Sequence, residues 1–370
     1  MIEWKMREMD LSDLKRAPST IWELETPVPL VDVDVACRNL ERWQRRCEQL
    51  GIANRPHIKT HKMVLWANEQ LRLGALGITV QKLGEAEVMA RAGITDIFVT
   101  YNIVGAGKVK RLARLARSNE IKVTADNREC CRQTAHAAAR AGRAIGVFVE
   151  CDTGGKRNGV QSPEEALELA RFIDGQRFLE LEGLMTFPAN GSRIASAEFL
   201  SKSQDLLLAA GLPCNAVSSG GSTDMWSAEG LERVTEYRAG TYIFNDRSLV
   251  DSNSCSLDDC AVTVLATVVS KPSSGDRITL DAGSKALTSD LRNFNDYGIE
   301  LASGNPVYSL SEEHGLLDVR GWEGAPAVGD MVRILPNHVC PVINLFDEVA
   351  LVRGEEVVGM ATVDARGKVQ

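Results

Sequence analysis

The sequence lacks the features that mark several large classes of protein. Lys and Arg number 42 against 50 Asp and Glu, so the formal net charge is −8. Without a basic excess to hold a polyanion, nucleic acid is not expected as a partner. No run approaches the roughly 18 apolar residues of a membrane span. The N-terminal stretch also mixes acids and bases where a signal peptide needs an apolar core. A membrane partner is therefore not expected.

The sequence also lacks a disulfide pattern and the common nucleotide-binding motifs. The nine cysteines are odd in number, irregular in spacing and contain no CxxC pair, which disfavours a disulfide framework. A reducing compartment follows as the expectation, and we predict a cytoplasmic protein. Neither GxxxxGK[ST] nor GxGxxG occurs, so the two commonest nucleotide signatures are absent.

The composition is that of a folded chain with more than one domain. Hydrophobic residues make up 44% and charged residues 25% of the 370 residues, close to the average for globular proteins. At about 150 residues per domain, the length predicts two or three domains.

From about residue 28 to 245, short apolar or β-branched runs alternate with helical patterns such as 163–173, which is typical of βα units with parallel strands. These units fit a (β/α)8 barrel better than an open doubly wound sheet. Polar side chains also follow several of the runs, where barrel enzymes place their sites. The eight predicted strands are 28–34, 54–59, 77–80, 96–102, 121–126, 145–152, 181–187 and 215–221.

After about residue 255 the pattern changes to short strand-like runs separated by Gly, Pro and Asp, which predicts a mostly antiparallel β domain. The predicted fold class is thus α/β plus β, a barrel over 26–250 followed by a β domain over 251–370. Residues 1–25 can pack on either domain, and we group them with the second.

The most unusual stretch is 55–62, RPHIKTHK, which concentrates basic side chains at the end of a predicted barrel strand. Most lysines lie on the surface, and Lys59 can be read that way. The alternative is an amine desolvated by its pocket, which becomes a nucleophile toward a carbonyl group. His57 and His61 have the spacing of a helical metal pair, but Pro56 and the strand pattern argue against that helix.

Two glycine-rich segments follow predicted strands. The segment 152–159, DTGGKRNG, can be only a tight connection, or Arg157 can contact an anion or phenolate. The segment 218–223, SSGGST, precedes a helical pattern, and its N–H groups and hydroxyls are suited to cradling a phosphate. A pair of glycines in a turn is by itself weak support for ligand binding by either segment.

Near the C-terminus, His338 and Cys340 lie two residues apart, so an extended segment would present both on one face. An imidazole with a thiolate suits zinc, and two protein ligands leave positions for water, substrate or a third residue. The alternative is a buried Cys beside a loop histidine. The segment 312–315, EEHG, supplies further acids and a histidine that can join this region.

Taken together, these motifs resemble one family. The chain is similar to the D-threonine aldolase and D-serine dehydratase family, the fold-type III pyridoxal-phosphate enzymes with an alanine-racemase-like barrel. The resemblance runs in order over most of the chain. It rests on 26–27, 55–62, 81–87, 152–159, 218–223, 238–246, 280–285, 312–315 and 336–341.

The resemblance implies roles for single residues. The first lysine of RPHxK binds the cofactor covalently in the family, which corresponds to Lys59 and leaves Lys62 a bystander. The arginine of the DxGxxRxG motif contacts the cofactor's phenolic oxygen, and the HxC or HxD pair binds a divalent metal, zinc or manganese. The expected catalytic residues are Lys59, His338 and Cys340, of which the last two are the metal ligands. The expected cofactor contacts are Lys59, Gln81, Arg157, Gly220, Gly221, Ser222, Thr223 and Tyr242.

The resemblance also implies a lyase acting on small D-3-hydroxy amino acids, in a homodimer. Retro-aldol cleavage to glycine and an aldehyde is the leading expectation, and dehydration to a keto acid and ammonia is the alternative. Cys340 matches the zinc dehydratases, whereas 341–347 looks more like the aldolases. Phe187 departs from the Tyr or His that is common at its place, which leaves the catalytic base open. A racemase and a non-catalytic cofactor carrier are weaker alternatives.

Overall fold

A computed structural model describes residues 9–12 and 14–370 of the chain, which divide into two compact units. The β unit contains the described residues up to Cys37, together with Phe244–Ser248 and Leu257–Arg366. The barrel unit contains Arg38–Ile243, Leu249–Ser256 and Gly367–Gln370.

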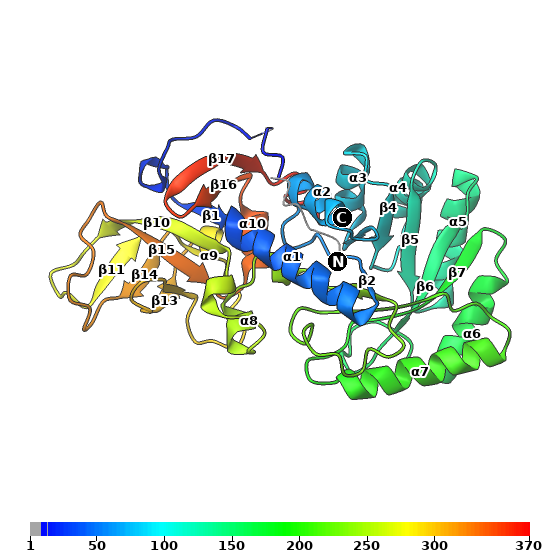
Figure 1. Cartoon of the computed structure of the whole chain (residues 1–370). Helices are drawn as coiled ribbons and strands as arrows, with labels where there is room; N and C mark the ends of the chain where they lie inside the picture. The colour runs from blue at the N-terminus through cyan, green and yellow to red at the C-terminus, as the bar shows by residue number, and fades with distance from the viewer. Residues whose placement is uncertain (1–8, 13) are drawn as a thin grey trace. The chain divides into compact units, whose positions relative to one another are not determined.

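Within the described residues, the barrel unit is built on an eight-stranded parallel sheet in the order β2-β9-β8-β7-β6-β5-β4-β3 (Figure 1). A helix follows each of these strands except β8, which is followed by turns and irregular backbone. The strands are β2 (Ala53–Asn54), β3 (Ile78–Val80), β4 (Asp96–Val99), β5 (Glu120–Ala125), β6 (Ile145–Cys151), β7 (Leu179–Thr186), β8 (Ala216–Gly220) and β9 (Glu236–Arg238).

The two ends of this sheet are joined by backbone pairing just beyond β2. His57 forms a parallel bridge with Thr79 of β3. The Ile58 N–H donates to the Thr79 carbonyl at 2.9 Å, and the Thr79 N–H donates to the Pro56 carbonyl at 2.8 Å. The sheet therefore closes, and the predicted barrel is confirmed.

The helices of the barrel unit begin where the sequence supplies caps. Ser162 accepts a hydrogen bond from the Glu165 N–H at 3.1 Å, and Pro163 occupies the first helical position. Asn127 caps its helix in the same way through the Cys130 N–H. The helices are α2 (Val64–Arg72), α3 (Leu83–Arg91), α4 (Ala106–Ala116), α5 (Arg128–Ala141), α6 (Pro163–Asp174) and α7 (Arg193–Ala209), and α1 (Val33–Leu50) leads from the β unit into the barrel unit.

One predicted barrel strand belongs elsewhere. The run 28–34 forms β1 (Val28–Asp32), which pairs antiparallel with β10 (Val262–Ser270) and parallel with β16 (Glu348–Arg353) in the β unit. The unpredicted β9 completes the barrel instead. An apolar run is compatible with a buried strand in either sheet, so its periodicity could not show to which sheet β1 belongs. The predicted domain boundaries, 26–250 and 251–370, stay a prediction.

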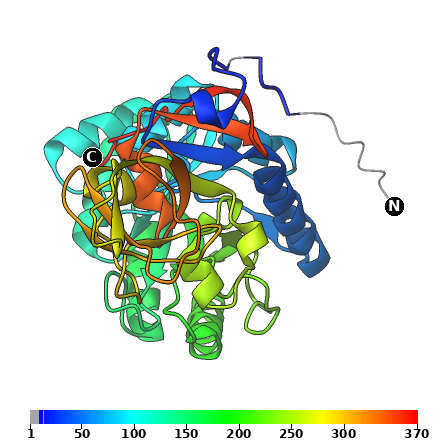
Figure 2. The ribbon, with the colours of Figure 1, turned by 90° about the vertical axis from the view of Figure 1, so that its left-hand side faces the viewer.

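The β unit is a mixed sheet in the order β13-β14-β11-β10-β1-β16-β17, with β15 pairing β10 and β12 pairing β15. Among the described residues, all strand pairings of this sheet are antiparallel except β1 with β16, which lie side by side as blue and red strands (Figures 1 and 2). The mostly antiparallel domain is thus confirmed. The remaining strands are β11 (Arg277–Leu280), β12 (Gly298–Glu300), β13 (Val307–Leu310), β14 (Gly315–Asp318), β15 (Met331–Pro336) and β17 (Glu356–Thr362).

Short helices and apolar packing complete the two units. Buried aliphatic side chains of β10, β11, β14 and β15 form one core of the β unit, and Phe98, Phe148 and Met185 pack together inside the barrel.

In the part of the chain that the structure describes, no helix has the length and hydrophobicity to span a membrane. The short helices are η1 (Ile21–Glu23), η2 (Thr241–Ile243), α8 (Arg247–Asp251), η3 (Leu257–Asp259), α9 (Ser284–Leu287) and α10 (Val339–Leu345).

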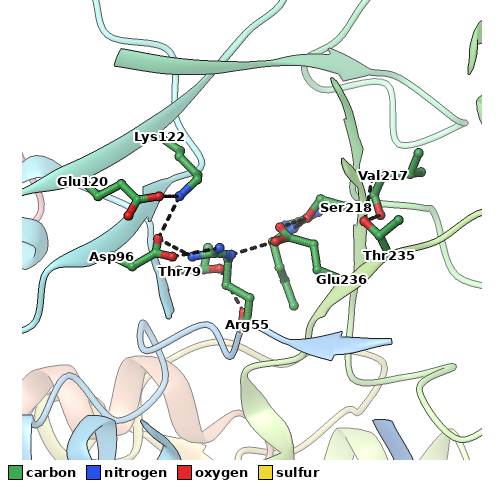
Figure 3. A network of polar contacts seen from close by, with 10 residues as sticks. Arg55, Thr79, Asp96, Glu120, Lys122, Val217, Ser218, Thr235 and Glu236 are labelled. Carbon is green, nitrogen blue, oxygen red and sulfur yellow. Dashed lines mark hydrogen bonds and ion pairs between the residues drawn. The ribbon is translucent and has the colours of Figure 1, made fainter. Parts of the chain in front are cut away.

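A buried ionic network lies at the end of the barrel where the strands begin (Figure 3). Arg55 donates to Glu236 at 2.8 Å and to Asp96 at 2.6 Å, and Lys122 also contacts Asp96 at 3.2 Å. Asp96 and Glu236 are the first residues of β4 and β9. Arg55 is only 1% exposed. The prediction that the basic side chains of 55–62 gather at the carboxyl ends of the barrel strands is therefore wrong for Arg55. Its side chain points to the opposite end of the barrel.

Candidate active site

Lys59 lies in the turn directly after the strand pairing that closes the barrel. It is partly buried, and its Nζ lies 5.9 Å from the centre of the Phe187 ring. The neighbouring Lys62 is buried and forms an ion pair with Glu85 at 2.9 Å. Of these two lysines, Lys59 is the one that faces the carboxyl ends of the strands, as predicted.

His57 fixes the turn that carries Lys59. The Lys59 N–H donates to His57 Nδ1 at 3.3 Å, so the ring proton sits on Nε2, which donates to Gln81 Oε1 at 3.1 Å. Burial, together with the nearby charges of Lys59 and Arg238, holds the pKa of His57 well below its ordinary value. A neutral histidine therefore supports the lysine.

Gln81 and His61 have structural partners of their own. The Gln81 amide also donates to the Thr100 carbonyl at 2.9 Å, so the structure shows Gln81 holding His57, and a direct cofactor contact stays a prediction. His61 bonds to Gln70 at 3.3 Å and accepts from the Met63 N–H at 3.1 Å. His57 and His61 thus have separate partners, in agreement with the sequence argument against a metal pair.

The glycine-rich connection 152–159 presents Arg157 beside Phe187. Asp152 Oδ1 accepts from the Gly154 and Lys156 N–H groups at 3.0 Å each, which folds the connection back on its strand. Gly159 has φ +120°, and a Cβ there would lie 2.3 Å from the Asp152 nitrogen. Arg157 is exposed, and its guanidinium lies 5.2 Å from the Phe187 ring centre. Phe187 therefore has both predicted cofactor cations, Lys59 and Arg157, close to its ring.

The predicted phosphate-binding turn lines a cavity together with Phe187, Asn190 and Arg193. A Cβ on Gly220 would lie 2.8 Å from the Arg238 carbonyl, and Gly221 has φ +117°. The turn therefore requires glycine at both positions. Ser222 and Thr223 line the same cavity, and Ser222 Oγ also accepts from the Thr241 N–H at 3.1 Å.

The expectation that a helix follows this turn is wrong. Residues 221–235 form turns and irregular backbone before β9. Arg193, at the start of α7, holds this loop by donating to the carbonyls of Asp224 at 2.5 Å, Ser227 at 2.9 Å and Glu229. Tertiary contacts, and not a helix start, thus shape the turn.

Tyr242 is placed differently from the other predicted contacts. Its hydroxyl accepts from Gln70 Nε2 at 3.2 Å, and the side chain is 1% exposed. Burial raises the pKa of its hydroxyl. The structure therefore shows a packing role, and cofactor contact by Tyr242 stays a prediction.

Two buried charged groups lie deeper in the barrel. Arg238 donates to Ser218 Oγ at 2.7 Å and to the Thr186 carbonyl at 2.5 Å, and burial lowers the pKa of its guanidinium to about 10. Glu150 is 4% exposed and lines a cavity with Arg157. Burial raises its pKa, and Oε2 has no hydrogen-bond partner among the described residues. Such an oxygen is a place where a bound group can be accommodated.

In the β unit, His338 and Cys340 lie at the start of α10, with His338 at the N-cap and Cys340 inside the first turn. The segment is thus not extended through both residues, as the spacing argument assumed. Burial lowers the pKa of the His338 imidazole, but the Cys340 thiol and Asp290 outweigh it, so the pKa lies above its ordinary value. The two side chains therefore interact, and their role as metal ligands stays a prediction.

The segment EEHG does not join this pair. Glu312 and Glu313 form exposed ion pairs with Lys285 at 3.0 and 2.6 Å. The partners of the His338 ring are Asp290 and Arg292, at 2.5 and 2.7 Å. Among the described residues, no group of three or more His, Cys, Asp or Glu side chains is placed to hold a metal.

Comparison with known proteins agrees with this arrangement. Residues 31–248 match the family described as the alanine racemase N-terminal domain, and residues 261–352 match the putative serine dehydratase domain. A D-threonine aldolase from Arthrobacter sp. is 33% identical over 362 residues, covering 93% of each chain. The chain belongs to the D-threonine aldolase and D-serine dehydratase family. It is an enzyme, a pyridoxal-phosphate-dependent lyase like the aldolases and dehydratases of that family.

Other members of the family are similarly close. The D-threo-3-hydroxyaspartate dehydratase of Delftia sp. (strain HT23) is 32% identical over 353 residues, covering 87% of this chain and 92% of that one. The crystal structure of the D-threonine aldolase from Filomicrobium marinum superimposes with a TM-score of 0.89 at 29% identity, covering 96% of this chain and 99% of that one. The barrel and β domain are thus shared across family members with different reactions.

Several residues of the site were not identified from the sequence. Arg238 lies inside the segment 238–246 that carried the family resemblance, and its position at the start of RAGTY was an available signal. Arg193, Asp290 and Arg292 lie in segments without a motif. Their importance depends on loop backbones meeting in space, for which a single sequence carries no signal.

Proposed function

We propose that the chain cleaves D-3-hydroxy amino acids between Cα and Cβ, giving glycine and an aldehyde, with pyridoxal phosphate and a divalent metal. The observation that carries the proposal is the 33% identity, over 93% of both chains, to a protein named D-threonine aldolase. In the cleavage the 3-hydroxyl loses its proton, the Cα–Cβ bond breaks, and Cα gains a proton.

The residues of the barrel mouth fit the cofactor. Lys59 would bind it through Nζ, and the N–H groups and hydroxyls of 220–223 would hold its phosphate. When bound, pyridoxal phosphate supplies an electron sink for the electron pair left on Cα. The glycines support this placement because both line the cavity without side chains of their own to fill it.

His57 and Phe187 determine the surroundings of Lys59. Neutral His57 adds no positive charge beside Lys59, and its Nδ1 anchors the Lys59 backbone at 3.3 Å. The Phe187 ring offers no exchangeable proton, and Lys59 and Arg157 both lie close to it. Proton exchange at this position therefore has to come from a group other than Phe187.

For the metal, His338 Nε2 and Cys340 Sγ would be the protein ligands. An imidazole and a thiolate suit zinc, with open positions for water or substrate, and manganese is the second candidate. A metal held there would polarise a hydroxyl oxygen of the substrate as a Lewis acid.

Dehydration is the second candidate function, favoured by Cys340. In that reaction the α-proton is lost, the 3-hydroxyl departs, and the product becomes a 2-keto acid and ammonia. The 32% identity to a protein named D-threo-3-hydroxyaspartate dehydratase supports this alternative to a similar degree.

Product analysis separates the two reactions. The purified chain would be supplied with pyridoxal phosphate, zinc or manganese, and a panel of D-3-hydroxy amino acids that includes D-threonine and D-serine. We expect glycine with an aldehyde. Ammonia with a 2-keto acid would establish the dehydratase instead, and turnover of none of the panel would overturn both.

Two variants test the assignments within this assay. Lys59→Ala should abolish the covalently reducible yellow colour of bound cofactor, whereas Lys110→Ala, on the surface of α4, should retain it. His338→Ala should remove activity while the colour remains. Full turnover of the wild-type chain after extensive chelation would contradict the metal role.

The assembly and compartment are part of the proposal. We propose a homodimer, to be checked by sedimentation of the cofactor-loaded protein, with a monomer as the contradicting result. A cytoplasmic location is proposed from the irregular, odd set of cysteines.

A further inference from the structure

The loop before β12 meets the start of α10 around the His338 side chain. The Asn337 side chain donates to the Leu291 carbonyl at 3.4 Å and to the Asp296 carbonyl at 2.5 Å. Asn337 is 1% exposed. The loop carrying Asp290 and Arg292 is therefore tied to the residue directly before His338.

Both ring nitrogens of His338 are engaged by this loop. Nδ1 lies 2.5 Å from Asp290 Oδ2, and Nε2 lies 2.7 Å from an Arg292 guanidinium nitrogen. An ionised carboxylate only accepts hydrogen bonds and a guanidinium only donates them. Nδ1 therefore carries the ring proton, and Nε2 presents its lone pair to Arg292.

One carboxylate organises both contacts. Asp290 Oδ1 accepts from the backbone N–H of Arg292 at 3.3 Å, while Oδ2 holds the imidazole. Arg292 has φ +54°, in the left-handed region that non-glycine residues adopt infrequently. This turn directs the Arg292 side chain toward the nitrogen that Asp290 has left without a proton.

We propose that Asp290 and Arg292 control metal binding at His338 in opposite directions, Asp290 by presenting Nε2 as the ligand and Arg292 by competing for it. The inference rests on the proposed function, since His338 must be a metal ligand. A carboxylate on the far nitrogen of a ligating imidazole fixes the ring and raises its basicity. A metal and the guanidinium need the same lone pair, so one displaces the other.

The surroundings allow this exchange. The Arg292 side chain is 43% exposed and can turn into solvent, whereas the His338 side chain is 16% exposed and stays in place. Cys340, in the first turn of the helix that His338 caps, would supply the second donor. Asp290 and Arg292 are therefore positioning residues that act through His338.

Zinc titration of the full-length, cofactor-loaded protein tests the proposal after its metal has been removed with a chelator. The readout is the zinc dissociation constant, measured by competition with a chromophoric chelator. Asp290→Ala should weaken zinc binding about 10- to 100-fold. Asp290→Asn, which keeps an acceptor oxygen, should recover part of that loss. Arg292→Met should strengthen zinc binding by about 2- to 10-fold, the value of one competing hydrogen bond.

The controls separate this inference from the proposed function. Arg320→Met, at an exposed arginine of the same unit, should bind zinc as the wild type does. If His338→Ala binds zinc as tightly as the wild type, the metal site itself is wrong and the inference falls with it. If His338→Ala abolishes binding while the Asp290 and Arg292 variants match the wild type, only this inference is overturned. Weaker zinc binding by Arg292→Met would overturn the competition.

Discussion

His57 pairs with Thr79 across the seam of the barrel, and the same residue fixes the turn that carries Lys59. Its backbone closes the sheet while its imidazole is held between the Lys59 N–H and Gln81. The position of Lys59 is thus defined by the closure of the barrel, which explains how a short turn can hold its amine in place.

Replacing Gln81 with Leu should loosen this arrangement. The buried His57 Nε2–H and the Thr100 carbonyl would both lose their partner, at a cost of about 1–3 kcal/mol for each unsatisfied group. We expect the dissociation constant of pyridoxal phosphate to rise at least about tenfold, measured by absorbance titration of the apoprotein. Gln49→Leu, at an exposed position on α1, serves as the control. Cofactor affinity equal to that of the wild type would show that Gln81 does not support Lys59.

Replacing Arg193 with Leu should weaken the phosphate-binding turn. Arg193 is held to the carbonyls of Asp224, Ser227 and Glu229, and their loop follows directly on the turn 220–223. Losing these charge-assisted hydrogen bonds should raise the pyridoxal-phosphate dissociation constant about tenfold or more. Pyridoxal without phosphate should bind as it does to the wild type. An equal loss for both compounds would place the effect outside the phosphate turn.

Replacing Arg55 with Leu should destabilise the barrel while leaving the site at the opposite strand ends in place. Glu236 would remain buried without its cation, while the partly exposed Asp96 keeps Lys122, and breaking one side of a buried ion pair costs about 3–5 kcal/mol. Urea unfolding should report this loss. Arg132→Leu removes an exposed ion pair with Glu129 and should cost no more than about 1 kcal/mol. Equal midpoints for the two variants would contradict the structural role of Arg55.

The stability of the chain should fall as the pH drops below the ordinary histidine range. Burial lowers the pKa of His61 from 6.5 to about 4, so the folded state keeps the ring neutral while the unfolded chain takes up a proton. Its contribution is present above pH 6.5 and is lost as the pH approaches 4. The loss is roughly 3 kcal/mol in the free energy of unfolding.

Urea unfolding of His61→Gln between pH 7 and pH 4 checks this prediction. The variant should show a shallower decline of stability with falling pH than the wild type. His136→Gln, at an exposed position on α5, is the control and should follow the wild type. A decline in His61→Gln as steep as that of the wild type would assign the acid sensitivity to other groups.

The sequence by itself determined the βα alternation, the antiparallel pattern after residue 255 and the order of the family motifs. These depend on local properties, namely side-chain periodicity, helix caps such as Ser162 and turns that need glycine. Lys59 and the glycine-rich turn were recognisable for the same reason, because each motif is contiguous in the chain.

Only the tertiary structure decided which strands share a sheet and which side chains meet. β1 joins the β unit because β10 and β16 are available to pair with it, and the three-residue β9 takes a barrel position that its own pattern does not indicate. Arg55 points to the opposite end of the barrel from Lys59, although only three residues separate them in the chain. The Asp290–His338–Arg292 arrangement likewise depends on two loops brought together by strand pairing, which is a long-range contact that no local pattern encodes.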